Sequence, residues 1–236
     1  MNRLTLRRSV VVLRSARLQI VLACALACVP FAAHAKGGDC AADVAARVQK
    51  RYDAVRDLRG RFEQRTERVA LGGAPEDALV ASGEVLFAKP GMMRWRYEAP
   101  EPSLVVSDGK TLWIFDEAAR EVQKLPLAAG YLSAAGLQFL LGDGKRTDAF
   151  RIAASDCDAK RVTLHLTPLQ PSHFELLELG VDGRTAIVAE TTVVDLFGNR
   201  TRVAFEDLRE NTRPDAALFR FEAPAGVRVI EVPGSP

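Results

Sequence analysis

The middle of the chain, from Ser82 to Asp116, alternates apolar and polar residues on both sides of two turn signals. Residues 83–89 and 93–98 alternate across Pro90-Gly91, and Asp108-Gly109 separates two further apolar runs. This pattern predicts two successive β-hairpins. Because strand side chains alternate between the faces of a sheet, the first hairpin has one apolar face that ends in a single basic residue. The side chains of that face are Val85, Phe87, Lys89, Met93, Trp95 and Tyr97.

The length of the turn decides which residues of the first hairpin lie opposite each other. We expect a three-residue loop from Pro90 to Met92, which is one of the common hairpin connections. The pairs that follow from this loop are Phe87 with Trp95, Val85 with Tyr97, and Lys89 with Met93.

Two elements are predicted before the hairpins. Apolar residues recur at three-to-four spacing from Asp39 to Val55, which predicts a helix that packs one face on a core. Leu58 to Val69 then alternates strictly, with charged residues on one phase and Phe62 on the other. Charges at period two indicate a strand with one face in water.

A second helix is predicted beyond the hairpins, at Ala128 to Leu141, where Ser133 is a plausible N-cap and Gly142 a plausible stop. It is apolar on more than one side, so it lies either deep in the core or between a sheet and another layer. Strand signals resume after it at 150–152, 162–166, 177–181, 186–194, 203–205 and 219–221. The whole pattern predicts one mainly-β domain, with a single antiparallel sheet of about 11 strands and two or three helices.

Residues 1–35 have the pattern of an export signal. Five arginines form a basic leader, Leu18 to Ala33 is the apolar run, and Ala33-His34-Ala35 fits a small-residue cleavage site. The alternatives are a membrane anchor, for which the run is short, and lipidation at Cys24. We expect cleavage after Ala35, which leaves residues 36–236 as the mature domain.

Composition and charge exclude several functions. The predicted signal holds five arginines and no acidic residue, so its removal changes the net charge from +2 to −3 and leaves no basic footprint for nucleic acid. Two histidines remain, too few for a histidine-rich metal site, and both His165 and His173 are expected to be solvated. No nucleophile elbow or nucleotide-binding fingerprint is present. We therefore predict neither catalytic residues, nor a metal, nor a cofactor.

Two cysteines, Cys40 and Cys157, lie outside the predicted signal. In an exported protein an isolated pair favours a disulfide over two free thiols.

Apolar residues exceed what one face of a sheet needs. Trp113 and Phe115 are opposite in phase to Leu112 and Ile114, so this strand is apolar on both faces. Composition alone favours a core on both sides of the sheet. The alternative is a concave sheet whose inner face is covered by helices and opens to an apolar guest.

A set of ordered motifs resembles one known family. The central pieces are G-x-V-x-F-x-K-P from Gly83, R-W-x-Y-x-x-P from Arg94 and L-V-V-S-D-G-K-T-L-W-I-F-D from Leu104. F-x-Q precedes them at Phe62, and G-L-Q-F-L-L-G, a G-N turn and F-R-F-E-A-P-A-G-V follow. In this order they resemble the periplasmic LolA-type carriers of outer-membrane lipoproteins.

The resemblance implies an unclosed, strongly curved β-barrel with a lid of short helices over an apolar cavity. It implies a periplasmic, monomeric protein that takes the acyl chains of lipoproteins from an inner-membrane ABC transporter and passes them to an outer-membrane receptor. Lys89 stands where the family commonly has an arginine that holds the lid by hydrogen bonds to helix carbonyls. The expected cavity residues are Phe62, Val85, Phe87, Met93, Trp95, Tyr97, Leu137, Leu140 and Leu141.

Three other functions stay open. The first is an outer-membrane lipoprotein receptor of the same fold, and the second is a periplasmic regulator that senses lipids or lipoproteins. The third is a lipid esterase, for which no nucleophile–base pair is visible in the sequence.

Overall fold

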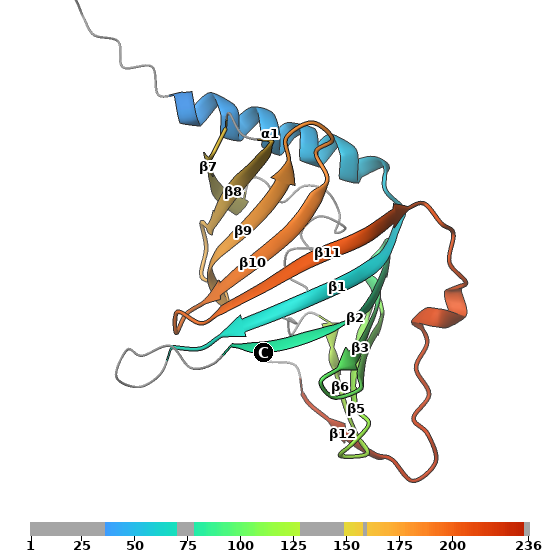
Figure 1. The fold of residues 1–236 in the computed structure, drawn as a ribbon. Helices are drawn as coiled ribbons and strands as arrows, with labels where there is room; N and C mark the ends of the chain where they lie inside the picture. The colour runs from blue at the N-terminus through green and yellow to red at the C-terminus, as the bar shows by residue number, and fades with distance from the viewer. Residues whose placement is uncertain (1–35, 70–77, 128–148, 158–159, 234–236) are drawn as a thin grey trace, which may run out of the picture. The chain divides into compact units, whose positions relative to one another are not determined.

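A computed structural model describes residues 36–69, 78–127, 149–157 and 160–233, all within one compact unit, Ala35–Pro236. The unit is built on one curved sheet with a helix across one end of its strands (Figure 1). Its elements are α1 (Lys36–Ala54), β1 (Asp57–Glu67), β2 (Leu79–Ala88), β3 (Met92–Ala99), β4 (Ser103–Asp108), β5 (Thr111–Asp116), β6 (Glu121–Pro126), β7 (Phe150–Ser155), β8 (Arg161–Pro168), β9 (Phe174–Asp182), β10 (Val188–Asp195), β11 (Arg200–Glu210), the 3₁₀-helix η4 (Ala216–Phe219) and β12 (Arg228–Glu231).

The sheet contains 12 strands in the order β12-β6-β5-β4-β3-β2-β1-β11-β10-β9-β8-β7, and its two edge strands do not pair. This confirms a mainly-β, unclosed architecture and corrects the expected count of about 11 antiparallel strands. Every neighbouring pair is antiparallel except β12 with β6, which is parallel. The predicted lid of several helices is not confirmed, because α1 is the one α-helix in the described residues and the predicted helix 128–141 lies outside them.

Three errors in the strand count have local causes. β6 was missed because its apolar residues Val122 and Leu125 are three positions apart and give no period-two signal, and the four-residue β12 was missed because it is a short edge strand. Residues 219–221 were predicted as a strand, but Phe219 ends the 3₁₀-helix η4. The two phenylalanines at 219 and 221 therefore give a period-two signal that belongs to no strand.

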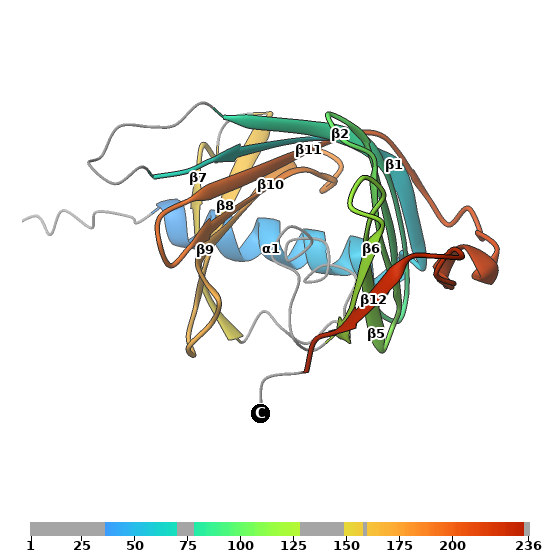
Figure 2. The same ribbon diagram turned by 90° about the horizontal axis from the view of Figure 1, so that it is seen from below.

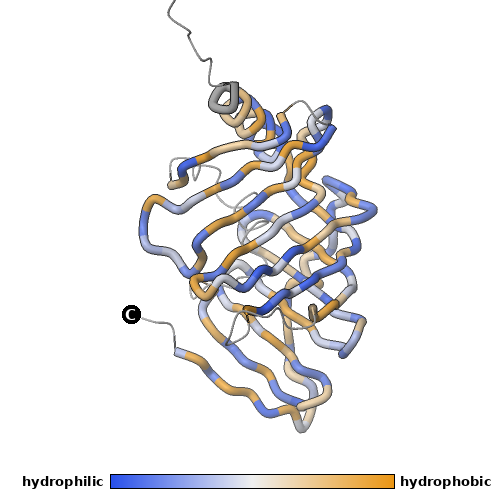
Figure 3. The backbone as a smooth tube through the Cα atoms, turned by 60° about the vertical axis from the view of Figure 1, so that its left-hand side comes forward, coloured by the Kyte–Doolittle hydropathy of each residue, from blue (hydrophilic) through white to orange (hydrophobic). Residues whose placement is uncertain are grey.

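The two faces of the sheet have different surroundings. Hydrophobic and hydrophilic residues alternate along the strands (Figure 3), and α1 lies on the inner side of the curved sheet (Figure 2). Val44, Val48 and Tyr52 of α1 belong to the same buried cluster as the inner residues of the strands. The helix stripe predicted from the sequence is thus confirmed as a core-facing stripe.

The outer face of β4 and β5 has its own apolar cover. Val106 is fully buried there, and the rings of Trp113 and Phe115 lie 6.3 and 5.8 Å from that of Phe221. The segment that carries Phe219 and Phe221 comes from beyond β11 and packs η4 against β3 and β4. Strands that are apolar on both faces are therefore explained here by a C-terminal segment on the outside of the sheet.

No helix in the described part of the chain combines the length and the apolar character needed to cross a lipid bilayer.

A disulfide joins the first turns of α1 to the loop after β7. Cys40 and Cys157 have their Cα atoms 6.2 Å apart and are separated by 117 residues, which confirms the predicted pairing. The bond fastens the helix beside β7, the free edge of the sheet.

We expect the disulfide to contribute strongly to stability. Closing a loop of 117 residues restricts the unfolded chain, and the chain-entropy relation puts the upper value at about 4–5 kcal/mol. Urea unfolding of the oxidised protein should show a higher midpoint than that of Cys40→Ser/Cys157→Ser. Reductant should lower the midpoint of the wild type and leave that of the double variant unchanged. Equal midpoints with and without reductant would contradict this contribution.

Candidate functional site

Aromatic side chains of three adjacent strands meet on the inner face of the sheet. Phe62 comes from β1, Phe87 from β2, and Trp95 and Tyr97 from β3. The ring of Trp95 lies 4.6 Å from that of Phe62 and 5.8 Å from that of Phe87, and Phe62 meets the edge of Tyr97 at 5.1 Å. Tilted and edge-on contacts at these distances are favourable for aromatic pairs. The result is a continuous aromatic row across the strands.

Gly83 makes room for this row. A Cβ atom at this position would lie 1.9 Å from the backbone oxygen of Arg96 and 3.1 Å from the ring of Phe62. The pairing of β2 with β3 also shifts between Ser82 and Gly83, which is an irregularity of the kind that glycine permits. Close packing against β3 and Phe62 therefore explains why a glycine stands at the start of the first family motif.

The register of the β2–β3 hairpin differs by two residues from our prediction. Its loop is Lys89-Pro90-Gly91, and Gly91 has a φ of +63°. A three-residue hairpin loop ends in a left-handed position, which glycine occupies at little cost and methionine would not. The observed pairs are Val85 with Trp95, Phe87 with Met93, and Ala88 with Met92.

A shift of two residues leaves the face of every side chain unchanged. Val85, Phe87, Met93 and Trp95 are buried, and all of them belong to the inner cluster. Their place on one apolar face is as predicted, whereas Leu137, Leu140 and Leu141 lie outside the described residues. The prediction omitted other members of the inner cluster, among them Leu58 and Phe205, although Phe205 lies 6.4 Å from Trp95 and shares the period-two signal of its strand.

Two polar groups touch the aromatic row. The Tyr97 hydroxyl donates a hydrogen bond of 3.0 Å to Gln64 Oε1, so the F-x-Q motif supplies both an aromatic neighbour and a polar partner. Trp95 is fully buried, and its Nε1 atom has no hydrogen-bond partner within the described part of the chain. The described residues around the centre of the row therefore offer no acceptor to this N–H group.

Lys89 joins the hairpin to the last turn of α1. Its Nζ atom donates a hydrogen bond of 2.6 Å to the carbonyl oxygen of Tyr52, and its backbone N–H donates to the carbonyl of Arg56 at 2.9 Å. The final carbonyl groups of a helix lack intrahelical donors and carry the negative end of the helix dipole, so an ammonium group is favourable there. The Lys89 ammonium therefore has a backbone partner in the helix.

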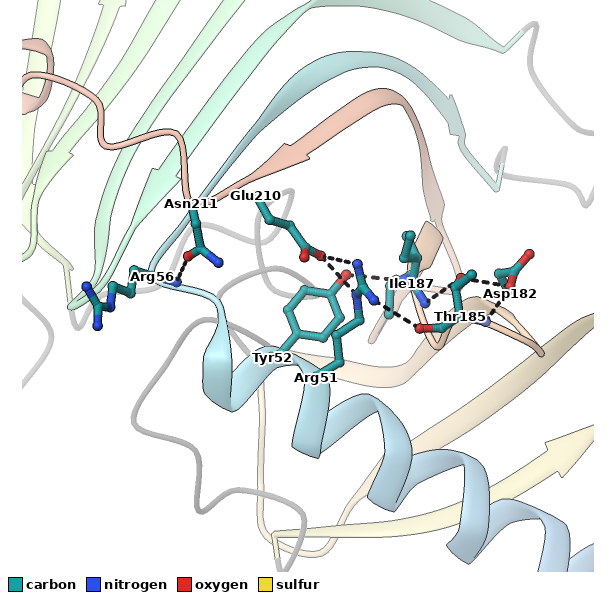
Figure 4. Close-up of polar contacts among 9 residues, drawn as sticks. Arg51, Tyr52, Arg56, Asp182, Thr185, Ile187, Glu210 and Asn211 are labelled. Atoms are coloured by element: carbon teal, nitrogen blue, oxygen red, sulfur yellow. Dashed lines mark hydrogen bonds and ion pairs between the residues drawn. The ribbon is translucent and has the colours of Figure 1, made fainter.

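The same end of α1 is tied to the opposite half of the sheet (Figure 4). Arg51 forms an ion pair of 2.8 Å with Glu210 at the end of β11 and donates to the carbonyl of Thr185 at 3.2 Å. The Tyr52 hydroxyl accepts a 3.2 Å hydrogen bond from the backbone of Val188, and burial raises the pKa of Tyr52 to about 12. These contacts fix the C-terminal half of α1 over the end of the sheet.

The titratable residues elsewhere in the described part of the chain do not form a metal site. In the described residues no group of three or more His, Cys, Asp or Glu side chains is placed to hold a metal ion. His165 was expected to be solvated, but its Nε2 lies 3.1 Å from Ser155 Oγ and its Nδ1 3.6 Å from Glu178. Glu178 is also bound by Arg200 at 2.6 Å on the outer face, where such cross-strand contacts stabilise a sheet.

Comparisons with known proteins identify the family. A family model described as "Outer membrane lipoprotein carrier protein LolA" matches residues 53–222. A protein of Cupriavidus pinatubonensis named "Outer-membrane lipoprotein carrier protein" is 30% identical over 213 residues, which cover 90% of this chain and 97% of that protein. One of the same name from Nitrosomonas europaea is 34% identical over 154 residues, covering 64% of this chain and 72% of the relative.

Among solved structures, the LolA superfamily protein NE2245 from Nitrosomonas europaea is similar at 12% identity and a TM-score of 0.43, covering 77% of this chain and 97% of that chain. The assignment therefore rests on the sequence matches and on the ordered motifs of the inner face. The chain belongs to the LolA family of outer-membrane lipoprotein carrier proteins.

Proposed function

We propose that this protein is a periplasmic carrier that binds the acyl chains of lipoproteins and delivers them to the outer membrane. The observation that carries the proposal is the aromatic row of Phe62, Phe87 and Trp95 on the inner face of an unclosed sheet. An open sheet can part from its cover without breaking a closed ring of strand pairing. The family membership supports the same function.

In this function the inner face receives the lipid and the helices cover it when it is empty. Burying one methylene group is worth about 0.8 kcal/mol, so several acyl chains would bind almost irreversibly in a rigid, permanently open site. A cover that the lipid must displace lowers the net affinity, because the contacts of the closed state are lost on loading. We propose that Lys89 is part of this cover's latch, since it bonds the carbonyl of Tyr52 in α1.

The proposed carrier function implies two partner proteins. A monomeric carrier without catalytic function needs an inner-membrane ABC transporter that releases lipoproteins to it and an outer-membrane receptor that binds them more tightly. It also needs export, for which residues 1–35 remain the predicted signal. A receptor of the same fold would itself be lipidated, whereas a carrier incorporates no labelled fatty acid.

Co-purification tests the function directly. The protein is isolated from periplasm, and material bound to it is analysed by mass spectrometry. We expect lipidated proteins, present in wild-type material and depleted from Phe87→Glu. Recovery of free phospholipid or sterol-like amphiphiles alone would contradict lipoprotein carriage, and covalently attached palmitate on the protein would favour the receptor.

A further inference from the structure

The outer face of the sheet holds a cleft that the proposed function does not use. It has a volume of about 650 Å³ and lies between the strands β1, β2, β3 and β11 and the segment 212–218 that follows β11. Six of its lining residues are arginines and three are acidic, which gives the lining a net charge of +3. The arginines are Arg59, Arg61, Arg94, Arg96, Arg209 and Arg213.

The positive charge is concentrated in one row across the strands. In the cross-strand register Arg209 pairs with Arg59, Arg59 with Leu86, and Leu86 with Arg94. This row therefore holds three arginines and no carboxylate. Directly opposite like charges destabilise a sheet, since their Cβ atoms lie only about 4.5–5.5 Å apart. An anion between them would relieve this repulsion.

The neighbouring row shows the ordinary arrangement. There Glu206 pairs with Arg61, Arg61 with Glu84, and Glu84 with Arg96, so that acidic and basic residues alternate. Arg61 also forms an ion pair of 3.1 Å with Glu98. The two rows lie on the same strands and the same face, so the lack of carboxylates in the first row is a local property.

A second arginine pair on the same two strands makes the contrast sharper. Arg65 of β1 and Arg202 of β11 also lie directly opposite each other. Each has its own carboxylate, because Arg65 bonds Glu67 at 3.1 Å and Arg202 bonds Glu190 at 2.5 Å. The pair Arg59/Arg209 has no such partner: neither residue forms an ion pair with any described residue of the chain.

The segment after β11 forms the other wall of the cleft and is firmly held. The buried carboxylate of Asp57 accepts hydrogen bonds from the backbone of Thr212 at 2.6 Å and of Arg213 at 3.1 Å. Arg94 donates to the carbonyl of Leu218 at 3.2 Å. Burial, and secondarily the charge of Arg96, lower the pKa of Arg94 from its usual value. The arginines therefore face a fixed wall across the cleft.

The remaining acidic residues of the cleft do not neutralise the row. Asp215 caps η4 by accepting from the backbone of Ala217 at 2.9 Å. Neither it nor Asp207 lies within ion-pair distance of a cleft arginine in the described structure. Because neither aspartate pairs with Arg59 or Arg209, the guanidinium groups of these two arginines are available to a ligand.

We propose that this cleft is a binding site for phosphate groups, with Arg59, Arg209 and Arg94 as the residues that bind them. Guanidinium groups bind phosphate in a planar, bidentate manner, and a phosphate carries more than the single charge of a carboxylate. Three arginines in one cross-strand row match that higher charge. The size of the cleft suits a ligand larger than one phosphate ion, such as a diphosphate or the head group of an anionic lipid. The site does not depend on the apolar inner face.

Titration calorimetry with pyrophosphate tests the site, with Arg59→Gln/Arg209→Gln as the test variant. Arg65→Gln/Arg202→Gln is its matched control, because it removes two opposite arginines from the same strands and changes the net charge equally. We expect saturable binding by the wild type, a loss of at least about tenfold in the test variant, and a change of less than about twofold in the control. Melting curves of all three proteins establish that each is folded.

Vesicles then distinguish the sources of phosphate. Sedimentation is measured with phosphatidylglycerol vesicles and with phosphatidylcholine vesicles, in the presence and absence of pyrophosphate. Binding to phosphatidylglycerol that needs Arg59 and Arg209 assigns the site to lipid head groups, and pyrophosphate binding without vesicle binding assigns it to soluble phosphates. The proposal is overturned if neither probe binds, if both double variants lose binding equally, or if a glutamate-rich peptide binds this cleft and pyrophosphate does not.

Discussion

Phe87→Glu should abolish lipoprotein binding while the sheet persists. Phe87 is only 3% exposed, its ring packs against Trp95, and its backbone pairs with Met93. A carboxylate at this place must either be desolvated against acyl chains or take water into the apolar row, and an unpaired buried charge costs several kcal/mol. Binding of a lipidated protein, measured by co-elution in gel filtration, should fall by at least about a hundredfold, which corresponds to about 2.7 kcal/mol.

The control for this variant is Leu86→Glu. Leu86 is the preceding residue of β2, lies on the outer face and is partly exposed between arginines, so a carboxylate there is well tolerated. It should bind lipoprotein as the wild type does. Because Phe87→Glu also removes a core ring, circular dichroism and a urea midpoint accompany the assay, and Phe87→Leu serves as a milder variant. A folded Phe87→Glu that binds lipoprotein normally would show that the inner face does not receive the lipid.

The faces of the strands could be predicted because they depend on parity alone. The predicted register of the first hairpin was wrong by two residues, yet Val85, Phe87 and Trp95 still share the buried face. A slip of one residue would have exchanged the faces, but the turn residues Pro90-Gly91 limit the hairpin to a few loop lengths. The alternation of residues thus predicted the inner face correctly. The error in register came from the hairpin loop, which was predicted one residue too late in the sequence.

Features that join distant parts of the chain had no comparable signal. The acceptor of Lys89 is the backbone carbonyl of Tyr52. Every residue has a backbone carbonyl, so the residue type at position 52 does not indicate this contact. The segment after β11 is held by Asp57, 155 residues earlier, and has no periodicity of its own. The unbalanced arginine row becomes visible only when β11, β1, β2 and β3 are placed in register, because in sequence its members look like ordinary charged residues of solvated faces.

Lys89→Leu should accept lipoprotein but release it poorly. The ammonium of Lys89 and the carbonyl of Tyr52 form a charge-assisted hydrogen bond of 2.6 Å between the sheet and α1. If this contact stabilises the closed, empty protein, its loss costs that state about 1.5–3 kcal/mol and leaves the loaded state unchanged. The balance then moves toward the loaded protein by about tenfold to a hundredfold. Transfer from loaded carrier to membranes that contain the receptor should slow accordingly.

Two variants decide whether release requires the hydrogen bond from position 89 to Tyr52 or only a positive charge in this region. Lys89→Arg keeps the cation and adds a planar set of donors that can reach more than one carbonyl, so it should transfer lipoprotein at least as well as the wild type. Lys110→Leu removes an exposed lysine in the β4–β5 turn, whose ammonium group forms no hydrogen bond or ion pair with the described residues, so it should have no effect. Normal release by Lys89→Leu would leave Lys89 as a structural contact of the helix end and would remove it from the transfer step. Slow release by Lys89→Leu together with normal release by Lys89→Arg and Lys110→Leu would identify the bond to Tyr52 as the one that the lipid must break on entry and that re-forms on delivery.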